Sequence, residues 1–156
     1  MDATAPRDLR GRGSCMDRDG RRARRQSLES VIVGVGVDAV DIERIERMFA
    51  SKSDRMLNRL FVAAEVAFLS NKIAPAQHLA VRLAAKEAAY KALSGNELAR
   101  GIGWRDVEVL SREDGAPELR LHGRAAQRFA ELGGTTIHVS LTHSATTAIA
   151  VVIVER

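Results

Sequence analysis

The sequence predicts a single α+β domain over residues 31–156: an opening strand, three helices, then a small antiparallel sheet. Three observations predict it. Residues 31–40 alternate as a strand, and residues 82–93 contain strong helix formers with no Gly or Pro. Residues 136–154 then form two alternating apolar runs around a short turn. Their order, strand then helix then strands, favours an α+β domain.

The opening strand has two unlike faces. Its valines, Val31 through Val37 at every second position, share one face. Gly34, Gly36 and Asp38 share the other. Glycines within a strand mark the close approach of another backbone or of a ligand. This segment lacks the third glycine and the following helix of a dinucleotide-binding fingerprint.

Helices are predicted next. Asp41 caps an amphipathic helix over residues 42–49, whose apolar stripe is Ile42, Ile45 and Phe49. A second helix covers residues 63–70. Pro75 interrupts the chain before a third helix from about residue 78 to residue 93, which ends near Gly95.

The last third of the chain predicts mainly strands. Residues 104–110 and 118–121 form a hairpin, and residues 124–132 form a short helix. In the strand at 136–142, Ile137, Val139 and Leu141 point inward, and His138, Ser140 and Thr142 lie opposite. A final strand over residues 147–154 pairs with it.

The helix over residues 82–93 is apolar almost all round, yet it carries charges. They are Arg82, Lys86, Glu87 and Lys91. One interpretation is a solvated charged edge, since i,i+4 pairs are common on helix surfaces. The other is an anion site in which Glu87 is free to hold a metal, because buried charges need partners.

Composition limits the possible functions. The chain has 156 residues and one cysteine, Cys15, which excludes a disulfide framework and fits a reducing, cytoplasmic location. No apolar run approaches the ~20 residues that span a bilayer, so no membrane association is expected.

The net charge of +4 is unevenly placed: residues 1–30 have eight Arg against five acids, and the remainder has 16 basic and 15 acidic groups. Residues 1–30 predict a disordered basic tail rather than a secretory signal. A non-enzymatic, nucleic-acid-binding function of this tail is an alternative. The near-neutral body and the lack of an aromatic platform argue against it.

Polar residues interrupt the apolar pattern at three places. Asp38 and Glu87 are oxygen ligands from separate elements, which suit Mg²⁺, whereas zinc would want His or Cys. Arg82, Lys86 and Lys91 suit phosphates. His143 either donates to a phosphate or simply ends a strand. Another Mg²⁺-dependent nucleotide phosphotransfer or a pyrophosphate hydrolysis fits the same residues.

Three motifs in order resemble a known family. Residues 34–38 match G-x-G-x-D, residues 82–91 match R-[FL]-A-A-K-E-A-x-x-K, and residues 138–143 match H-V-S-x-[ST]-H. Together they resemble the holo-acyl-carrier-protein synthase group of 4′-phosphopantetheinyl transferases, over the whole of residues 31–156. Residues 61–69 are similar to the family's F-T-x-x-E segment, with Val62 in place of Thr. The loop at 95–103 is longer than the family's glycine-rich loop.

The resemblance implies a reaction and roles for residues. The phosphopantetheine of coenzyme A moves to a serine of apo acyl carrier protein, and adenosine 3′,5′-bisphosphate leaves. Asp38 and Glu87 would hold Mg²⁺, and Lys91 would neutralise the pyrophosphate. Glu87 or a metal-bound water would accept the serine proton. The coenzyme A contacts would be Arg82, Lys86, Lys91, Ser140, Thr142 and His143.

The resemblance also implies partners. The family forms homotrimers with sites between subunits, so His143 would serve a Glu87 of another chain. The family acts in fatty acid biosynthesis, although the residues do not identify the carrier protein. Because carrier proteins are acidic, Arg44 and Arg47, three apart on the first helix, are the predicted docking residues. The alternative is a helix surface salt-bridged to Glu43 and Glu46.

Overall fold

The computed structural model describes residues 31–156, except for the side chains of residues 51–54. The predicted tail at residues 1–30 lies outside the described residues. The elements in chain order are β1 (Ile32–Asp41), α1 (Ile42–Leu60), α2 (Ala63–Ser70), α3 (Pro75–Ala92), α4 (Glu97–Arg100), a 3₁₀ turn (Trp104–Asp106), β2 (Val107–Ser111), β3 (Pro117–Leu121), α5 (Gly123–Glu131), β4 (Thr136–His143) and β5 (Thr147–Glu155). None of the helices within residues 31–156 is long and apolar enough to cross a membrane.

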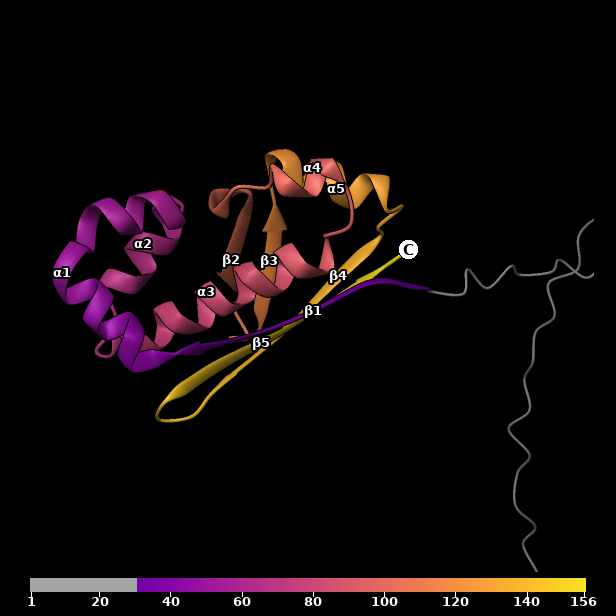
Figure 1. Cartoon of the computed structure of the whole chain (residues 1–156). Coiled ribbons are helices and arrows are strands. Elements are labelled where there is room, and N and C mark those ends of the chain that lie inside the picture. Colours follow the sequence, from indigo (N-terminus) through magenta and orange to yellow (C-terminus); the bar gives the residue numbers. More distant parts are fainter. Residues whose placement is uncertain (1–30) are drawn as a thin grey trace, which may run out of the picture.

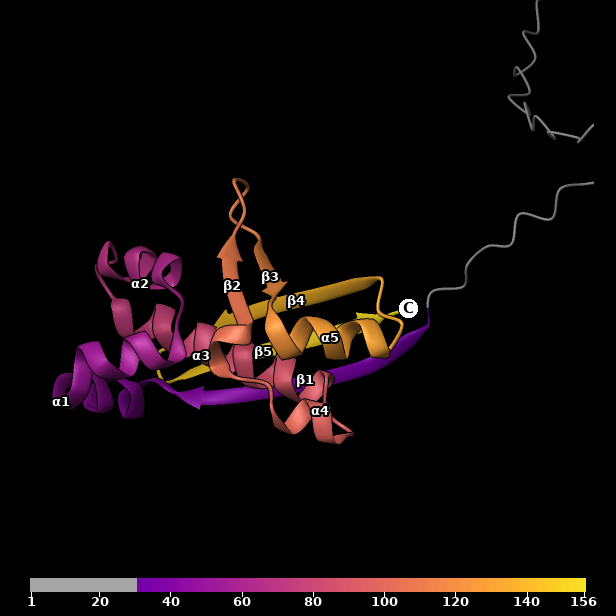
Figure 2. The same cartoon turned by 90° about the horizontal axis from the view of Figure 1, so that it is seen from above.

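The strands form two antiparallel sheets. The larger has the order β1-β5-β4, so the opening strand belongs to the sheet and pairs with β5 along its length. The smaller is the β2–β3 hairpin. Helix α3 lies along one face of the larger sheet, with α1 and α2 at one end and α4 and α5 at the other (Figure 1). The hairpin projects to the side of α3 (Figure 2).

Helix α3 lies unusually close to β1. A Cβ on Gly34 would overlap the carbonyl oxygen of Ala92, and one on Gly36 would overlap that of Ala88. The close approach predicted for this face is therefore made by the backbone of α3. The helix contributes only small side chains at this contact. They are Ala88 and Ala92, and both are buried.

The core lies between α3 and the larger sheet. In β5, Ala148, Ala150, Val152 and Val154 are completely buried and face α3. This alternation places the intervening residues of β5 on the opposite face. A second part of the core, under α1 and α2, includes Ile42, Ile45 and Phe61.

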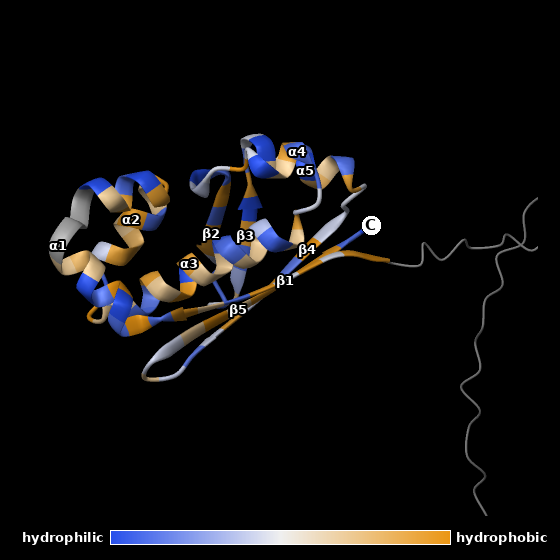
Figure 3. Ribbon diagram, viewed as in Figure 1, coloured by the Kyte–Doolittle hydropathy of each residue, from blue (hydrophilic) through white to orange (hydrophobic). Residues whose placement is uncertain are grey.

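The opposite face of the larger sheet is apolar and exposed. Val35, Val37 and Ile149 are 57%, 50% and 37% exposed. The register places Val35 beside Ile153, and Val37 beside Val151, on the same face. No element within residues 31–156 covers this face in Figure 1, and Figure 3 shows hydrophobic residues along β1. We call it the open face.

The predicted helices differ from the observed ones mainly at α1. Asp41 caps it as predicted, and its Oδ1 accepts a hydrogen bond of 2.7 Å from Arg44 N. The prediction that it ends at residue 49 is wrong, because α1 continues to Leu60. Its apolar side resumes at Met56, Leu57 and Leu60 after a polar stretch, and that stretch hid the continuation. Helix α3 begins at Pro75, which the first turn of a helix tolerates.

The contact between β1 and α3 predicts the effect of filling a glycine. Gly36→Ala should lower the free energy of unfolding by about 1–3 kcal/mol, because the added methyl overlaps backbone rather than a movable side chain. Urea denaturation measures the change. Gly103→Ala is the control: its φ of −88° suits alanine, and a Cβ would meet only the Asp106 carboxylate, with Oδ2 at an ordinary contact distance of 3.6 Å, so less than about 1 kcal/mol is expected. Equal stabilities for Gly36→Ala and wild type would contradict the packing argument.

Candidate active site

Two carboxylates and one ammonium meet where β1 faces α3. Asp38 follows Gly34 and Gly36 on the face of β1 that α3 approaches, and Glu87 and Lys91 lie one turn apart on α3. Lys91 Nζ donates to Asp38 Oδ1 at 2.8 Å and to Val37 O at 2.8 Å. The Lys91 side chain is 49% exposed and that of Asp38 is 18% exposed, so the group opens to solvent.

The charges of this group interact. Burial raises the pKa of Glu87, and the neighbouring Asp38 carboxylate raises it further, while Lys91 opposes both effects. Two carboxylates against one ammonium leave a net negative charge. The donor set is two hard oxygen ligands from separate elements, which fits Mg²⁺, an ion that keeps several waters and takes phosphate oxygens from its substrate. Residues 31–156 hold no cluster of three or more Asp, Glu, His or Cys suited to a metal, so substrate and water would complete the coordination.

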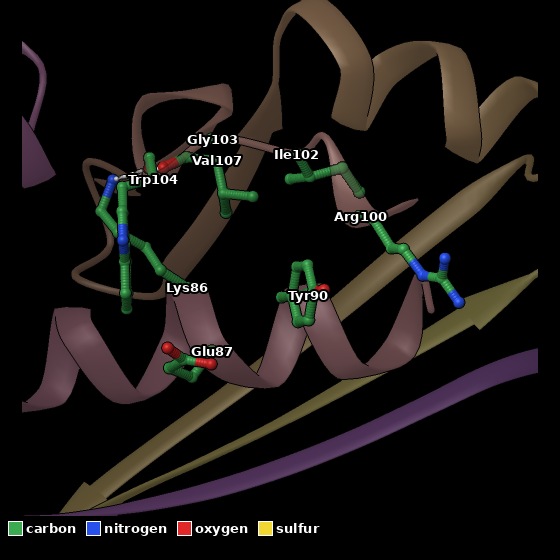
Figure 4. A pocket seen from close by; sticks show the side chains of 8 residues that line it. All are labelled: Lys86, Glu87, Tyr90, Arg100, Ile102, Gly103, Trp104 and Val107. Atoms are coloured by element: carbon green, nitrogen blue, oxygen red, sulfur yellow. Dashed lines mark hydrogen bonds between the residues drawn. The ribbon is translucent and has the colours of Figure 1, made fainter. Parts of the chain in front are cut away.

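Two cavities adjoin the carboxylates. The first, of about 230 Å³, lies between α3 and residues 100–107 across from it (Figure 4). Its lining is Lys86, Glu87, Tyr90, Arg100, Ile102, Gly103, Trp104 and Val107. The second, of about 560 Å³, runs along α1 from Asp38 past Arg44 and Met48 to Met56 and Arg59. We call them the small cavity and the α1 groove.

Lys86 lies beside Glu87 in sequence but has different surroundings. It is 2% exposed, and its ammonium donates to Glu65 Oε2 at 2.9 Å, to Trp104 O at 3.0 Å and to Val107 O. These three acceptors use all three of its protons. Lys86 therefore has no donor left for a coenzyme A phosphate, and its partners indicate a structural role.

A group of cations surrounds Phe68 on another side of α3. Arg82 and Lys72 stack on its ring, with the guanidinium carbon and the ammonium 3.9 Å and 4.3 Å from the centroid. His78 meets the ring edge-on at 6.0 Å. Burial lowers the pKa of His78, and the charges of Lys72, Arg82 and His143 lower it further. We call Lys72, His78, Arg82 and His143 the basic cluster.

Arg82 has unused hydrogen-bonding capacity. It is 5% exposed, and its Nη2 donates to Ser111 Oγ at 3.3 Å. Its Nε is buried without a hydrogen-bond partner in the described part of the chain. A guanidinium offers five donors, so this one could accept further anionic ligands.

The predicted site residues thus fall into three places. Asp38, Glu87 and Lys91 lie together. Arg82 and His143 belong to the basic cluster, and because Arg82 and Glu87 are five residues apart, they project about 140° apart around α3. Ser140 and Thr142 are exposed and share the open face with Val151 and Ile149, their partners across the strands. One chain does not bring all of them together.

The two predicted docking arginines also differ. Arg44 lines the α1 groove. Arg47 does not, and its Nε lies 3.9 Å from Glu43 on the solvent side, where both side chains are about three-quarters exposed. Arg59 lies in the same groove as Arg44. It is not among the predicted docking residues, because the predicted helix ends ten residues before it.

Comparison with known proteins gives the family. Residues 34–151 match the model of the family described as ACPS, the 4′-phosphopantetheinyl transferase superfamily. The chain belongs to this superfamily. A holo-[acyl-carrier-protein] synthase of Geobacter metallireducens is 44% identical over 126 residues, which cover 81% of this chain and 99% of the relative.

Solved structures agree with this assignment of the transferase. The holo-[acyl-carrier-protein] synthase of Neisseria meningitidis superposes with a TM-score of 0.71 at 25% identity, covering 81% of this chain and all of that one. That of Helicobacter pylori, solved in complex with coenzyme A, gives 0.64 at 26% identity, covering 77% and 98%. These matches confirm the predicted family, enzyme class and α+β fold.

The raised pKa of Glu87 in the transferase predicts a pH-dependent stability. Between the unfolded pKa of about 4.3 and the higher folded value, the native state binds more protons than the unfolded chain, so Glu87 costs stability as pH rises. In metal-free buffer Glu87→Gln should therefore raise the Tm by about 2 °C at pH 7. The gain should shrink steadily as the pH falls toward 4, where Glu87 becomes mostly protonated in both states.

Thermal melts from pH 4 to pH 8 test this. Glu118→Gln, at an exposed position of β3, is the control and should leave the Tm unchanged. A Glu87→Gln protein that melts below the wild type at pH 7 would contradict the electrostatic description.

Proposed function

We propose that this transferase moves 4′-phosphopantetheine from coenzyme A to a serine hydroxyl of an apo acyl carrier protein and releases adenosine 3′,5′-bisphosphate. The observation that carries the proposal is the Asp38–Glu87–Lys91 group, which opens onto both the small cavity and the α1 groove. In a transfer between two substrates, each substrate needs its own route to the same reacting groups. The coenzyme A complex of the Helicobacter pylori relative supports the choice of donor.

The chemistry follows from the charges. The serine oxygen bonds to the phosphorus that carries pantetheine, and the bond from that phosphorus to the bridging pyrophosphate oxygen breaks. Asp38 and Glu87 would hold Mg²⁺, which supplies neutralisation of the pyrophosphate charge when bound. Lys91 releases Asp38 and turns its half-exposed ammonium to the departing phosphate. The serine proton passes to Glu87, whose pKa is raised, or to a water beside it.

The two cavities suit the two substrates. The small cavity, lined by Tyr90, Ile102 and polar groups, suits the narrow pantetheine arm, which mixes amides with methyl groups. The α1 groove combines Arg44 and Arg59 with Met48 and Met56. Arginine with flexible methionine suits an acidic helix that also presents apolar side chains. We assign the carrier protein to this groove, with Arg44 and Arg59 as its charged contacts.

The remaining predicted contacts require a second copy of the chain. The basic cluster lies on a different side of α3 from Glu87, yet its cations suit the 3′-phosphate of coenzyme A. The open face exposes valine and isoleucine on two adjacent strands, which is the kind of surface that assembly buries. We infer a homotrimer in which the basic cluster and the exposed Ser140 and Thr142 of one subunit face Glu87 of the next. The cytoplasmic location and the role in fatty acid biosynthesis remain predictions.

The metal assignment predicts two inactive variants. Asp38→Ala and Glu87→Ala should each lower transfer about 100-fold or more, because the pyrophosphate charge is left exposed. The assay is intact-mass detection of phosphopantetheine on a panel of apo carrier proteins, with coenzyme A and Mg²⁺. Glu118→Ala is the control. Near-normal turnover by either variant at saturating Mg²⁺ would refute the assignment.

The α1 groove predicts a charge-reversal effect on one substrate only. Arg44→Glu should raise the KM for carrier protein about 10-fold at low salt and leave the KM for coenzyme A unchanged. The defect should shrink as salt rises, because screening weakens attraction and repulsion together. Arg47→Glu carries the same charge change outside the groove and should have a much smaller effect. Equal effects of the two variants would move the docking surface away from the groove.

Sites shared between subunits predict complementation. Glu87→Ala and His143→Ala should each be nearly inactive, yet mixed trimers should regain about a third of wild-type activity, since one of the three sites in each mixed trimer combines an intact Glu87 with an intact His143. Co-expression of two differently tagged chains and purification of the mixed species provides the sample. Absence of any recovery in mixed trimers would show that each site lies within one chain.

A further inference from the structure

Trp104 lies at the border between the two cavities. Among the described residues, Glu87 and Trp104 are the two that line both the small cavity and the α1 groove. Glu87 comes from α3, whereas Trp104 belongs to the segment that faces α3 across the small cavity (Figure 4). The border between the cavities is therefore made of one reacting carboxylate and one indole ring.

The backbone of Trp104 is held by a buried charge. Trp104 begins a 3₁₀ turn of three residues, which is too short to fix its own position. Its carbonyl accepts the 3.0 Å hydrogen bond from Lys86 Nζ, and the carbonyl of Val107 accepts from the same ammonium. The 3₁₀ turn and the start of β2 are thus both hydrogen-bonded to one side chain of α3, that of Lys86.

Glu65 of α2 fixes that ammonium in turn. Its Oε2 accepts from Lys86 Nζ at 2.9 Å and from Val62 N at 3.0 Å, and its Oε1 accepts from Val109 N at 3.1 Å. Both charged side chains are 1% exposed. Replacing such a pair with apolar residues often leaves stability unchanged, so its directional bonds are its distinctive property. Those bonds join α2, α3, the 3₁₀ turn and β2 at one point.

We propose that Trp104 is a positioning residue for the transfer and that the buried Glu65–Lys86 pair holds it at the border of the two cavities. This inference rests on the proposed function. The pantetheine arm enters the small cavity and the serine arrives through the α1 groove, and the indole limits how far either can shift past Glu87. A misplacement of about 1 Å between reacting groups can cost about 100-fold in rate.

Substitution of Trp104 tests the positioning role. Trp104→Leu should lower kcat at least 10-fold with the KM for carrier protein unchanged, and Trp104→Phe should retain at least a third of wild-type kcat because a flat ring remains. Both proteins should melt within a few degrees of wild type, since Trp104 is only partly buried. A purely structural role would instead lower the Tm and leave kcat of the folded protein intact.

A second variant tests the link to the buried pair. Glu65→Gln/Lys86→Gln removes both charges and keeps polar groups of similar size at both positions. Trp104 is the single tryptophan of the chain, so its fluorescence reports its own surroundings. We expect a red-shifted emission, about twofold stronger quenching by acrylamide, and a fall in kcat that matches Trp104→Leu. Arg112→Gln/Asp114→Asn, which neutralises an exposed pair at 3.3 Å on the hairpin, is the matched control.

The outcomes separate this inference from the proposed function. Failure of the wild-type enzyme to transfer phosphopantetheine to any carrier protein in the panel would overturn the proposed function, and this inference with it. Wild-type transfer combined with unchanged kcat in Trp104→Leu would overturn this inference alone. Unchanged Trp104 emission and kcat in a folded Glu65→Gln/Lys86→Gln protein would also overturn it, by showing that the buried pair does not hold the residue.

Discussion

The contact between the glycines of β1 and the alanines of α3 is the constraint on which the rest of the structure depends. With Gly34 and Gly36 opposite Ala88 and Ala92, helix and strand touch through their backbones. That closeness is what allows Lys91 of α3 to reach Asp38 and the Val37 carbonyl of β1. Larger residues in this contact would push the helix away from the strand and separate Lys91 from Asp38.

The four charges of α3 have three different environments, and this explains how a nearly apolar helix tolerates them. Lys86 is neutralised by a buried glutamate, Arg82 lies against an aromatic ring, and Glu87 and Lys91 open to solvent beside Asp38. Glu87 and Lys91 are the more accessible charges, whereas Arg82 is buried with an Nε that has no hydrogen-bond partner within residues 31–156. The helix therefore separates charges that stabilise the fold from charges that are available to a substrate.

Local patterns predicted most of the elements and the carboxylate pair. The alternation in β1, β4 and β5, the cap at Asp41 and the glycine face were all readable, because each depends on neighbours in sequence. The partners of Lys86 were not, since Glu65, Trp104 and Val107 lie 18 to 21 residues away and two of the contacts use backbone carbonyls. Lys72 and His78 were missed for a similar reason: their shared partner is Phe68, a residue with no charge to attract attention.

The spacing of the glycines also sets where α3 can stop along β1. Two residues of an extended strand advance about 6.8 Å, and the four residues from Ala88 to Ala92 advance about 6 Å along a helix. The two repeats nearly coincide, with Gly34 opposite Ala92 and Gly36 opposite Ala88, so strand and helix run in opposite directions in step. Sliding the helix by one residue would rotate larger groups into the contact, and sliding it by four residues would carry Glu87 about 6 Å from its place. The position of the Glu87 carboxylate along the helix axis is therefore determined by two matching repeats, the glycines of β1 and the alanines of α3, which contain no charged residue.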